Sequence, residues 1–127
     1  MKILDLVLMH KWYDMIEIGQ KPVEYRKAIP HWIKRLMLQY DTSAGKHIEI
    51  DNLTAQYFAD VPNAITAGLL SGELKFKDYD AVRFRRGYTK TSMLFEISGM
   101  YFGYGMYPHA GAPRNETVFN IVLGKRL

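Results

Sequence analysis

The stretch SMLFEISGMYFG, residues 92–103, alternates between apolar and other side chains and predicts a long β-strand. Met93 and Phe95 would point to one face of that strand. Two similar stretches flank it, DAVRFRRGY at 80–88 and TVFNIVLGKRL at 117–127. Glycine, proline or asparagine bounds each of the three, as is typical of strands joined by turns. The last third of the chain is therefore predicted to be an antiparallel sheet.

The first third is expected to contribute two more strands and two helices. Residues 2–9 are rich in isoleucine, leucine and valine and predict a buried strand, and VEYRK at 23–27 alternates as a second one. Residues 10–19 predict a short helix, with Trp12, Met15 and Ile16 on one face, that ends at Gly19. PHWIKRLML, residues 30–38, predicts another helix with proline in its first turn.

The middle of the chain, about Tyr40 to Asp78, has weaker patterns. QYDTSAGKHIEIDN is polar and is expected to be a connection. Asp51 or Asn52 would cap a helix over LTAQYFADV. PNAITAGLLSGEL predicts a further short helix that ends at Gly72.

Length and composition fit one domain over residues 1–127. Of these residues, 48% are apolar, which allows a real core, and no cysteine is present for disulfides or thiolate metal sites. The start, MKILDLVLMHKW, is too short and too interrupted for a signal peptide or a membrane span. We therefore expect a soluble cytoplasmic protein without a membrane partner. The fold class is α+β, a small partly closed antiparallel β-barrel of about five or six strands with flanking helices.

A first candidate site lies in IGQKPVEYRK, where Lys21, Glu24 and Arg26 fall within six residues. Glu24 and Arg26 would share one face of a strand. One interpretation is a carboxylate–guanidinium pair on a solvated edge, which would contribute less than about 1 kcal/mol. The other is a binding or proton-transfer site, in which the cations contact an anion or a base edge and Glu24 orients them or acts as a general base.

A second candidate site is RFRRGYTKTS. Its basic residues flank Tyr88, and they are Arg83, Arg85, Arg86 and Lys90. Arginines beside an exposed aromatic ring suit phosphate contacts combined with base stacking. The alternative is an ordinary charged end of a hairpin.

Glu96 is a third candidate because it interrupts the apolar strand MLFEISGM. A carboxylate there must face solvent or pair with a cation, since burial without a partner is costly. A pairing with Lys21 or Arg26 would create a buried polar centre suited to proton transfer. An outward glutamate on a half-exposed sheet is the other interpretation.

The segment GMYFGYGMYPHAGAPRNE, residues 99–116, mixes glycines with tyrosines and is either a mobile loop that covers a base-sized ligand or an irregular hairpin. The four histidines are scattered without ligand spacing, so no metal site is predicted. Nucleotide-binding and serine-hydrolase motifs are missing, and no cofactor is expected.

The run KWYDMIEIGQKPVEYRKAIPHWIKRL resembles the ASCH domain (activating signal cointegrator homology), a branch of the PUA-like superfamily. The family pattern Gly-x-Lys-x-x-Glu-x-Arg corresponds to Gly19, Lys21, Glu24 and Arg26. YDAVRFRRGY, MLFEISGMYFGYG and FNIVLGK resemble its barrel strands. Residues of about 40–77 have no counterpart and would be a helical insertion.

The resemblance implies a PUA-like barrel whose cleft binds RNA or another nucleic acid. One bacterial branch hydrolyses cytidine acylated on its exocyclic amine with a lysine, a threonine three residues later and a strand glutamate. Lys21 matches that lysine and Glu96 is a candidate for the strand glutamate, but Glu24 occupies the threonine position.

Three functions remain open on the sequence. The first is a module that binds RNA or a modified nucleoside through Lys21, Glu24, Arg26, Tyr88 and the neighbouring basic residues. The second is an amidohydrolase for acylated cytidine in which Lys21 stabilises the oxyanion and Glu24 or Glu96 moves the proton. The third is a protein-interaction module that uses the inserted helices.

Overall fold

The computed structural model describes the whole chain, Met1 to Leu127. In chain order its elements are β1 (Ile3–Leu8), α1 (His10–Glu17), β2 (Val23–Lys27), α2 (Pro30–Leu36), β3 (Met37–Asp41), β4 (Lys46–Glu49), α3 (Asn52–Asp60), α4 (Asn63–Ser71), β5 (Leu74–Phe76), β6 (Ala81–Arg86), β7 (Ser92–Tyr104), the 3₁₀ turn η1 (Pro108–Ala110) and β8 (Thr117–Arg126).

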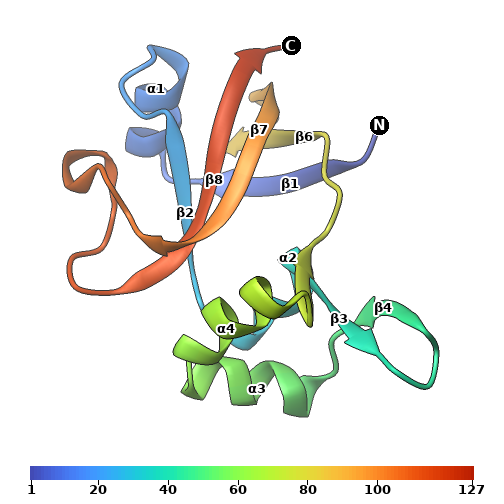
Figure 1. Cartoon of the computed structure of the whole chain (residues 1–127). Coiled ribbons are helices and arrows are strands. Elements are labelled where there is room, and N and C mark those ends of the chain that lie inside the picture. Colours follow the sequence, from blue (N-terminus) through green and yellow to red (C-terminus); the bar gives the residue numbers. More distant parts are fainter.

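A curled five-stranded sheet in the order β1-β6-β7-β8-β2 forms a half-barrel (Figure 1). Its α+β class and partly closed shape confirm the prediction. The pairs β6–β7, β7–β8 and β8–β2 are antiparallel as expected, but β1 pairs with β6 in parallel, so the prediction of an antiparallel barrel is wrong there. The long crossover that separates β1 from β6 makes a parallel pair possible.

The half-barrel stays open along the free edge of β1, which we call the seam. Leu8 turns its carbonyl toward β6, where it accepts a hydrogen bond from the Gly87 amide at 2.8 Å. The carbonyls of Asp5 and Val7 accept from arginines instead, at 3.0 Å from Arg35 Nη2 and 3.4 Å from Arg26 Nη2. Because Arg26 lies on β2, at the other edge of the sheet, this contact bridges the seam. Arginine side chains thus bond the β1 carbonyls that a neighbouring strand would otherwise bond on this side of the barrel.

Residues 37–76 form a second unit that is not only helical. A three-stranded sheet, β4-β3-β5, accompanies α3 and α4, so the expected connection QYDTSAGKHIEIDN is in fact largely the β3–β4 hairpin. The helix predicted over 30–38 is α2, which ends at Leu36 because Met37 begins β3. Helices α3 and α4 match the prediction and have nine residues each. No helix is long and apolar enough to cross a membrane.

One continuous core joins the two sheets. Phe119 on β8 lies at the junction, with ring centroids 6.1 Å from Phe76 on β5 and 5.2 Å from Phe102 on β7. Fully buried side chains of both halves belong to the same cluster, among them Leu4, Leu6, Ile33, Leu36, Phe58, Ile65, Leu74, Val82, Phe84, Phe119 and Ile121. The strands that carry the candidate sites are therefore held by a shared interior.

We expect Asp51→Ala to lower the unfolding midpoint more than Asp51→Ser. The predicted cap is formed by Asp51, whose carboxylate accepts the Thr54 amide at 2.8 Å at the start of α3. Serine keeps an oxygen acceptor at this position and alanine does not. Thermal unfolding of the three proteins at neutral pH measures the difference, and equal midpoints for alanine and serine would contradict the role of the cap.

Candidate functional site

The turn between α1 and β2 places the three charged residues of the first candidate site. Gly19 has φ +83° and ends α1 as predicted, which brings the chain back toward the sheet. Lys21 then precedes β2. Glu24 and Arg26 are two residues apart in that strand, so their side chains point to the same face. The local sequence is therefore sufficient to direct all three side chains to one place.

Lys21, Glu24 and Arg26 form a buried charged cluster. Glu24 Oε1 lies 3.3 Å from Lys21 Nζ, and Glu24 Oε2 accepts a hydrogen bond from Arg26 Nη1. Lys21 is 2% exposed and Glu24 is 4% exposed. The interpretation as a solvated edge pair is wrong, because Glu24 and Lys21 are buried and Arg26 is partly buried.

The ammonium of Lys21 is surrounded by π faces and by a carbonyl. It donates to the Ala110 carbonyl, 89 residues away in the chain, and lies 4.6 Å from the ring centroid of Tyr25 and 5.2 Å from that of Trp12. Burial lowers the pKa of Lys21, although the adjacent Glu24 carboxylate acts in the opposite direction. Lys21 therefore loses its proton more easily than an ordinary lysine does.

A pocket of about 380 Å³ lies over this cluster, next to the seam. Trp12, Trp32 and Tyr25 supply aromatic walls, and Lys21, Glu24 and Arg26 supply the polar groups. The Arg26 guanidinium stacks 5.0 Å from the ring centroid of Trp32. We call this hollow the Lys21 pocket. Its combination of aromatic faces with one carboxylate and two cations suits a flat ligand that carries both donors and acceptors.

The glycine- and tyrosine-rich segment 99–116 borders the pocket through its backbone. Ala110 receives the hydrogen bond from Lys21, and Gly111 lines the pocket with φ +94°. A Cβ at Gly111 would lie 3.4 Å from both Lys21 Nζ and the Trp12 ring. Strand β7 continues into this segment as far as Tyr104, so the hairpin interpretation describes its first part, while Tyr104 and Met106 remain exposed.

The second candidate site is only partly assembled. Arg85 and Tyr88 line a separate hollow beside the seam, and Tyr88 is 99% exposed. Arg83 pairs with Asp5 at 3.4 Å next to it. Arg86 is turned toward α1, where Asp14 accepts two hydrogen bonds at 2.9 and 3.0 Å from its guanidinium. This bond to Arg86 lowers the pKa of Asp14, so Arg86 has a partner within the fold and is not grouped with the other arginines.

Lys90 is exposed and forms no ion pair in the structure. It follows Tyr88 in the turn between β6 and β7. The prediction that Lys90 contacts a ligand is compatible with this placement, but none of the five pockets includes it.

Glu96 does not belong to the site. It lies in β7 opposite Ala81 of β6, and its half-exposed carboxylate is 3.9 Å from Lys125 Nζ. Of the two interpretations, the outward glutamate on a half-exposed sheet is confirmed, and the pairing with Lys21 or Arg26 is wrong because Glu24 from β2 occupies that position. No group of three or more histidine, aspartate or glutamate side chains is arranged to hold a metal ion.

Sequence reasoning missed the aromatic walls. Trp12 was expected on the buried face of the first helix, but α1 buries Tyr13 and Ile16 and leaves Trp12 at the pocket. Trp32 on α2 also lines the pocket, although no role in a site was predicted for it. The available signal was a tryptophan beside a lysine or histidine on each helix, since Lys11 and His31 mark where the helix surface meets solvent.

The lowered pKa of Lys21 predicts how stability changes in alkali. Between that lowered value and the unfolded value of 10.5, the unfolded chain binds the proton that the folded chain has released. The contribution of Lys21 to the free energy of unfolding should therefore rise with pH across this window and stay constant below it. Denaturant titrations of the wild type and of Lys21→Met between pH 7 and pH 10.5 give this contribution by difference. Parallel curves for the two proteins would contradict it.

Comparison of the chain with protein families, with curated proteins and with solved structures found no match.

Proposed function

We propose that the Lys21 pocket binds a nucleobase, either in RNA or in a free modified nucleoside, as the resemblance to the ASCH branch of the PUA-like superfamily implies. The observation that carries the proposal is the joining of two tryptophans and a tyrosine with the buried Lys21–Glu24–Arg26 cluster in one hollow of about 380 Å³. Aromatic side chains that accept a stacked base, with polar groups at its edge, are the usual means of single-strand recognition.

The polar groups suit a base that presents a carbonyl beside an exocyclic amine. Lys21 would donate to the carbonyl, and Glu24 would accept from the amine, in each case next to an existing contact. The cluster has one more positive than negative charge, so a ligand rich in acceptor atoms is favoured. Stacking on Trp12 or Trp32 would then hold the ring.

Hydrolysis of acylated cytidine is the second candidate, because a lysine with a perturbed pKa beside a carboxylate in a pocket is common at catalytic sites. This reaction needs a carboxylate that is free to accept a proton from water. Both carboxylate oxygens of Glu24 already contact cations, and Glu96 lies outside the pocket. Neither carboxylate is free to activate water without breaking an existing contact, so we favour binding.

Tryptophan fluorescence tests the proposal directly, because Trp12 and Trp32 are the only tryptophans and both line the pocket. Titration with cytidine, uridine and N4-acetylcytidine at low salt should change the emission in a saturable way. Trp12→Phe and Trp32→Phe then show which ring responds. Acetate release from N4-acetylcytidine in the same samples would identify the hydrolase instead.

Lys21→Met should weaken nucleoside binding by about 10- to 150-fold, since a hydrogen bond to a charged group is worth about 1.5–3 kcal/mol. Lys75→Met is the matched control, because Lys75 is exposed and lines no pocket. If no nucleoside alters the emission, or if both variants bind as the wild type does, the pocket does not recognise a base.

A further inference from the structure

Three neighbouring hollows form a series that begins at the seam and ends at α2. Val7 lines both the Lys21 pocket and the hollow of about 410 Å³ that holds Arg85 and Tyr88, which we call the Arg85 hollow. Arg35 lines both the Arg85 hollow and a larger pocket of about 570 Å³, which we call the Lys77 pocket. The Arg85 hollow therefore neighbours both the Lys21 pocket and the Lys77 pocket, with Val7 and Arg35 at the two boundaries.

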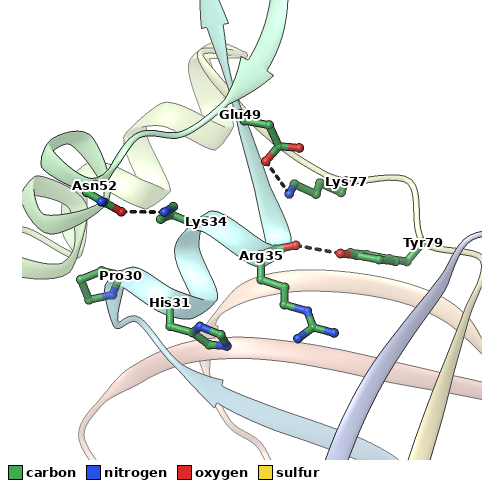
Figure 2. A pocket seen from close by; sticks show the side chains of 8 residues that line it. All are labelled: Pro30, His31, Lys34, Arg35, Glu49, Asn52, Lys77 and Tyr79. Atoms are coloured by element: carbon green, nitrogen blue, oxygen red, sulfur yellow. Dashed lines mark hydrogen bonds and ion pairs between the residues drawn. The ribbon is translucent and has the colours of Figure 1, made fainter.

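The Lys77 pocket lies where α2 meets the second unit (Figure 2). His31 and Arg35 extend from the same side of α2, while Lys34 turns toward Asn52 at the start of α3 (Figure 2). Lys77 approaches from the segment after β5 and reaches Glu49 at 2.7 Å. Basic side chains from α2 and from the segment after β5 thus converge on one hollow.

Cations dominate the series. The three hollows are lined by three carboxylates, Asp5, Glu24 and Glu49, and by six lysines and arginines, Lys21, Arg26, Lys34, Arg35, Lys77 and Arg85. This excess of three positive charges lies on one path, in a chain whose formal net charge is +4. Such a concentration attracts a ligand with repeated negative charge.

Several of these cations have no anionic partner. Lys34 Nζ donates to the amide oxygen of Asn52 at 2.6 Å, and Arg35 donates to the Asp5 carbonyl at 3.0 Å, both neutral acceptors. Arg85 is exposed and makes no ion pair. The fold holds Lys34 and Arg35 in place without neutralising them, which leaves their charge available to a ligand.

We propose that the seam carries the phosphate backbone of a single-stranded nucleic acid, with phosphates at the Arg85 hollow and the Lys77 pocket, while one of its bases occupies the Lys21 pocket. The inference rests on the proposed function and narrows its ligand from a free nucleoside to an oligonucleotide. Tyr88 offers a face on which a second base stacks. The second unit, through Glu49 and Asn52, thereby becomes part of the binding surface.

The test compares a seven-nucleotide single-stranded RNA with the corresponding nucleoside, using tryptophan emission and fluorescence anisotropy of end-labelled RNA. The wild type should bind the heptamer more tightly than the nucleoside and lose affinity as salt rises. The double variant Lys34→Ala/Arg85→Ala should bind the nucleoside normally. For the heptamer, the slope of log affinity against log salt should be less negative by about 1.4. The reason is that each phosphate contact of a single strand contributes about 0.7 to the slope, and the variant removes two cations.

A matched double variant, Lys46→Ala/Lys75→Ala, removes the same charge from exposed lysines outside the pockets. Equal salt slopes for the two double variants, or a heptamer that binds no tighter than the nucleoside, would overturn the phosphate path while leaving the base pocket intact. If heptamer binding depends on Lys34 and Arg85 but not on Lys21, the phosphate path is supported and the proposal that the Lys21 pocket binds a base is contradicted. Unfolding midpoints near that of the wild type show that both variants are folded.

Discussion

Replacing Glu24 with glutamine is expected to lower the free energy of unfolding by about 3–5 kcal/mol. Glu24 is the only carboxylate that contacts Lys21 and Arg26, and it does so with side-chain exposure of 5%. Its neutralisation leaves two cations facing each other in a site that water scarcely reaches. Loss of one partner from a buried ion pair costs far more than the pair itself contributes, because the remaining charge stays desolvated.

Urea denaturation at pH 7 measures this loss. Glu17→Gln is the control, since Glu17 is 3.6 Å from Arg126 at the surface and its replacement should cost no more than about 1 kcal/mol. The double variant Lys21→Met/Glu24→Gln should be more stable than Glu24→Gln alone, because it also removes a buried cation. A double variant that is less stable than both single variants would show that the cluster is held by packing and not by charge.

Phe119→Ala is expected to lower the free energy of unfolding by about 3–5 kcal/mol as well. Phe119 is 1% exposed and packs edge-on against Phe76, which belongs to the second sheet. Truncation would leave a cavity between Phe76 of the second sheet and Phe102 of β7. Destabilisation should therefore include a loosened attachment of residues 37–76, the segment that completes the Lys77 pocket.

Phe119→Leu keeps most of the volume and should cost much less than Phe119→Ala. Tyr104→Ala, at an aromatic residue that is 65% exposed, should leave stability nearly unchanged. Hydrogen exchange of α3 and α4 in Phe119→Ala reports the attachment of the second unit. Protection there that falls no more than in the five-stranded sheet would contradict the role of Phe119 as the junction.

Strongly patterned elements could be predicted from the sequence. Strands β6, β7 and β8 alternate over many residues, and their apolar faces became the core. The β3–β4 hairpin was missed because β4 has the sequence KHIE and is largely exposed, so no apolar face distinguishes it from a loop. The parallel β1–β6 pair was missed because nothing local in either strand specifies its partner.

The candidate site, likewise, could be predicted only where its residues lie close together in the sequence. Lys21, Glu24 and Arg26 could be grouped because one turn and one strand place them together. Ala110 and Val7 reach the cluster from distant parts of the chain, and their contribution is a backbone carbonyl, which no side-chain pattern reveals. For Glu96 the sequence left two interpretations open, a pairing with this cluster or an outward position, and the register of β7 places it outside the cluster.

The position of β1 and β2 at the two edges of the half-barrel has a consequence for synthesis on the ribosome. Both strands are made first, yet β1 pairs only with β6 and β2 only with β8. At about 5–20 residues per second, the apolar β1 waits roughly 4–15 s for its partner to be translated. Until then β1 is an apolar strand without a pairing partner, so the nascent chain is most prone to aggregation before β6 is made.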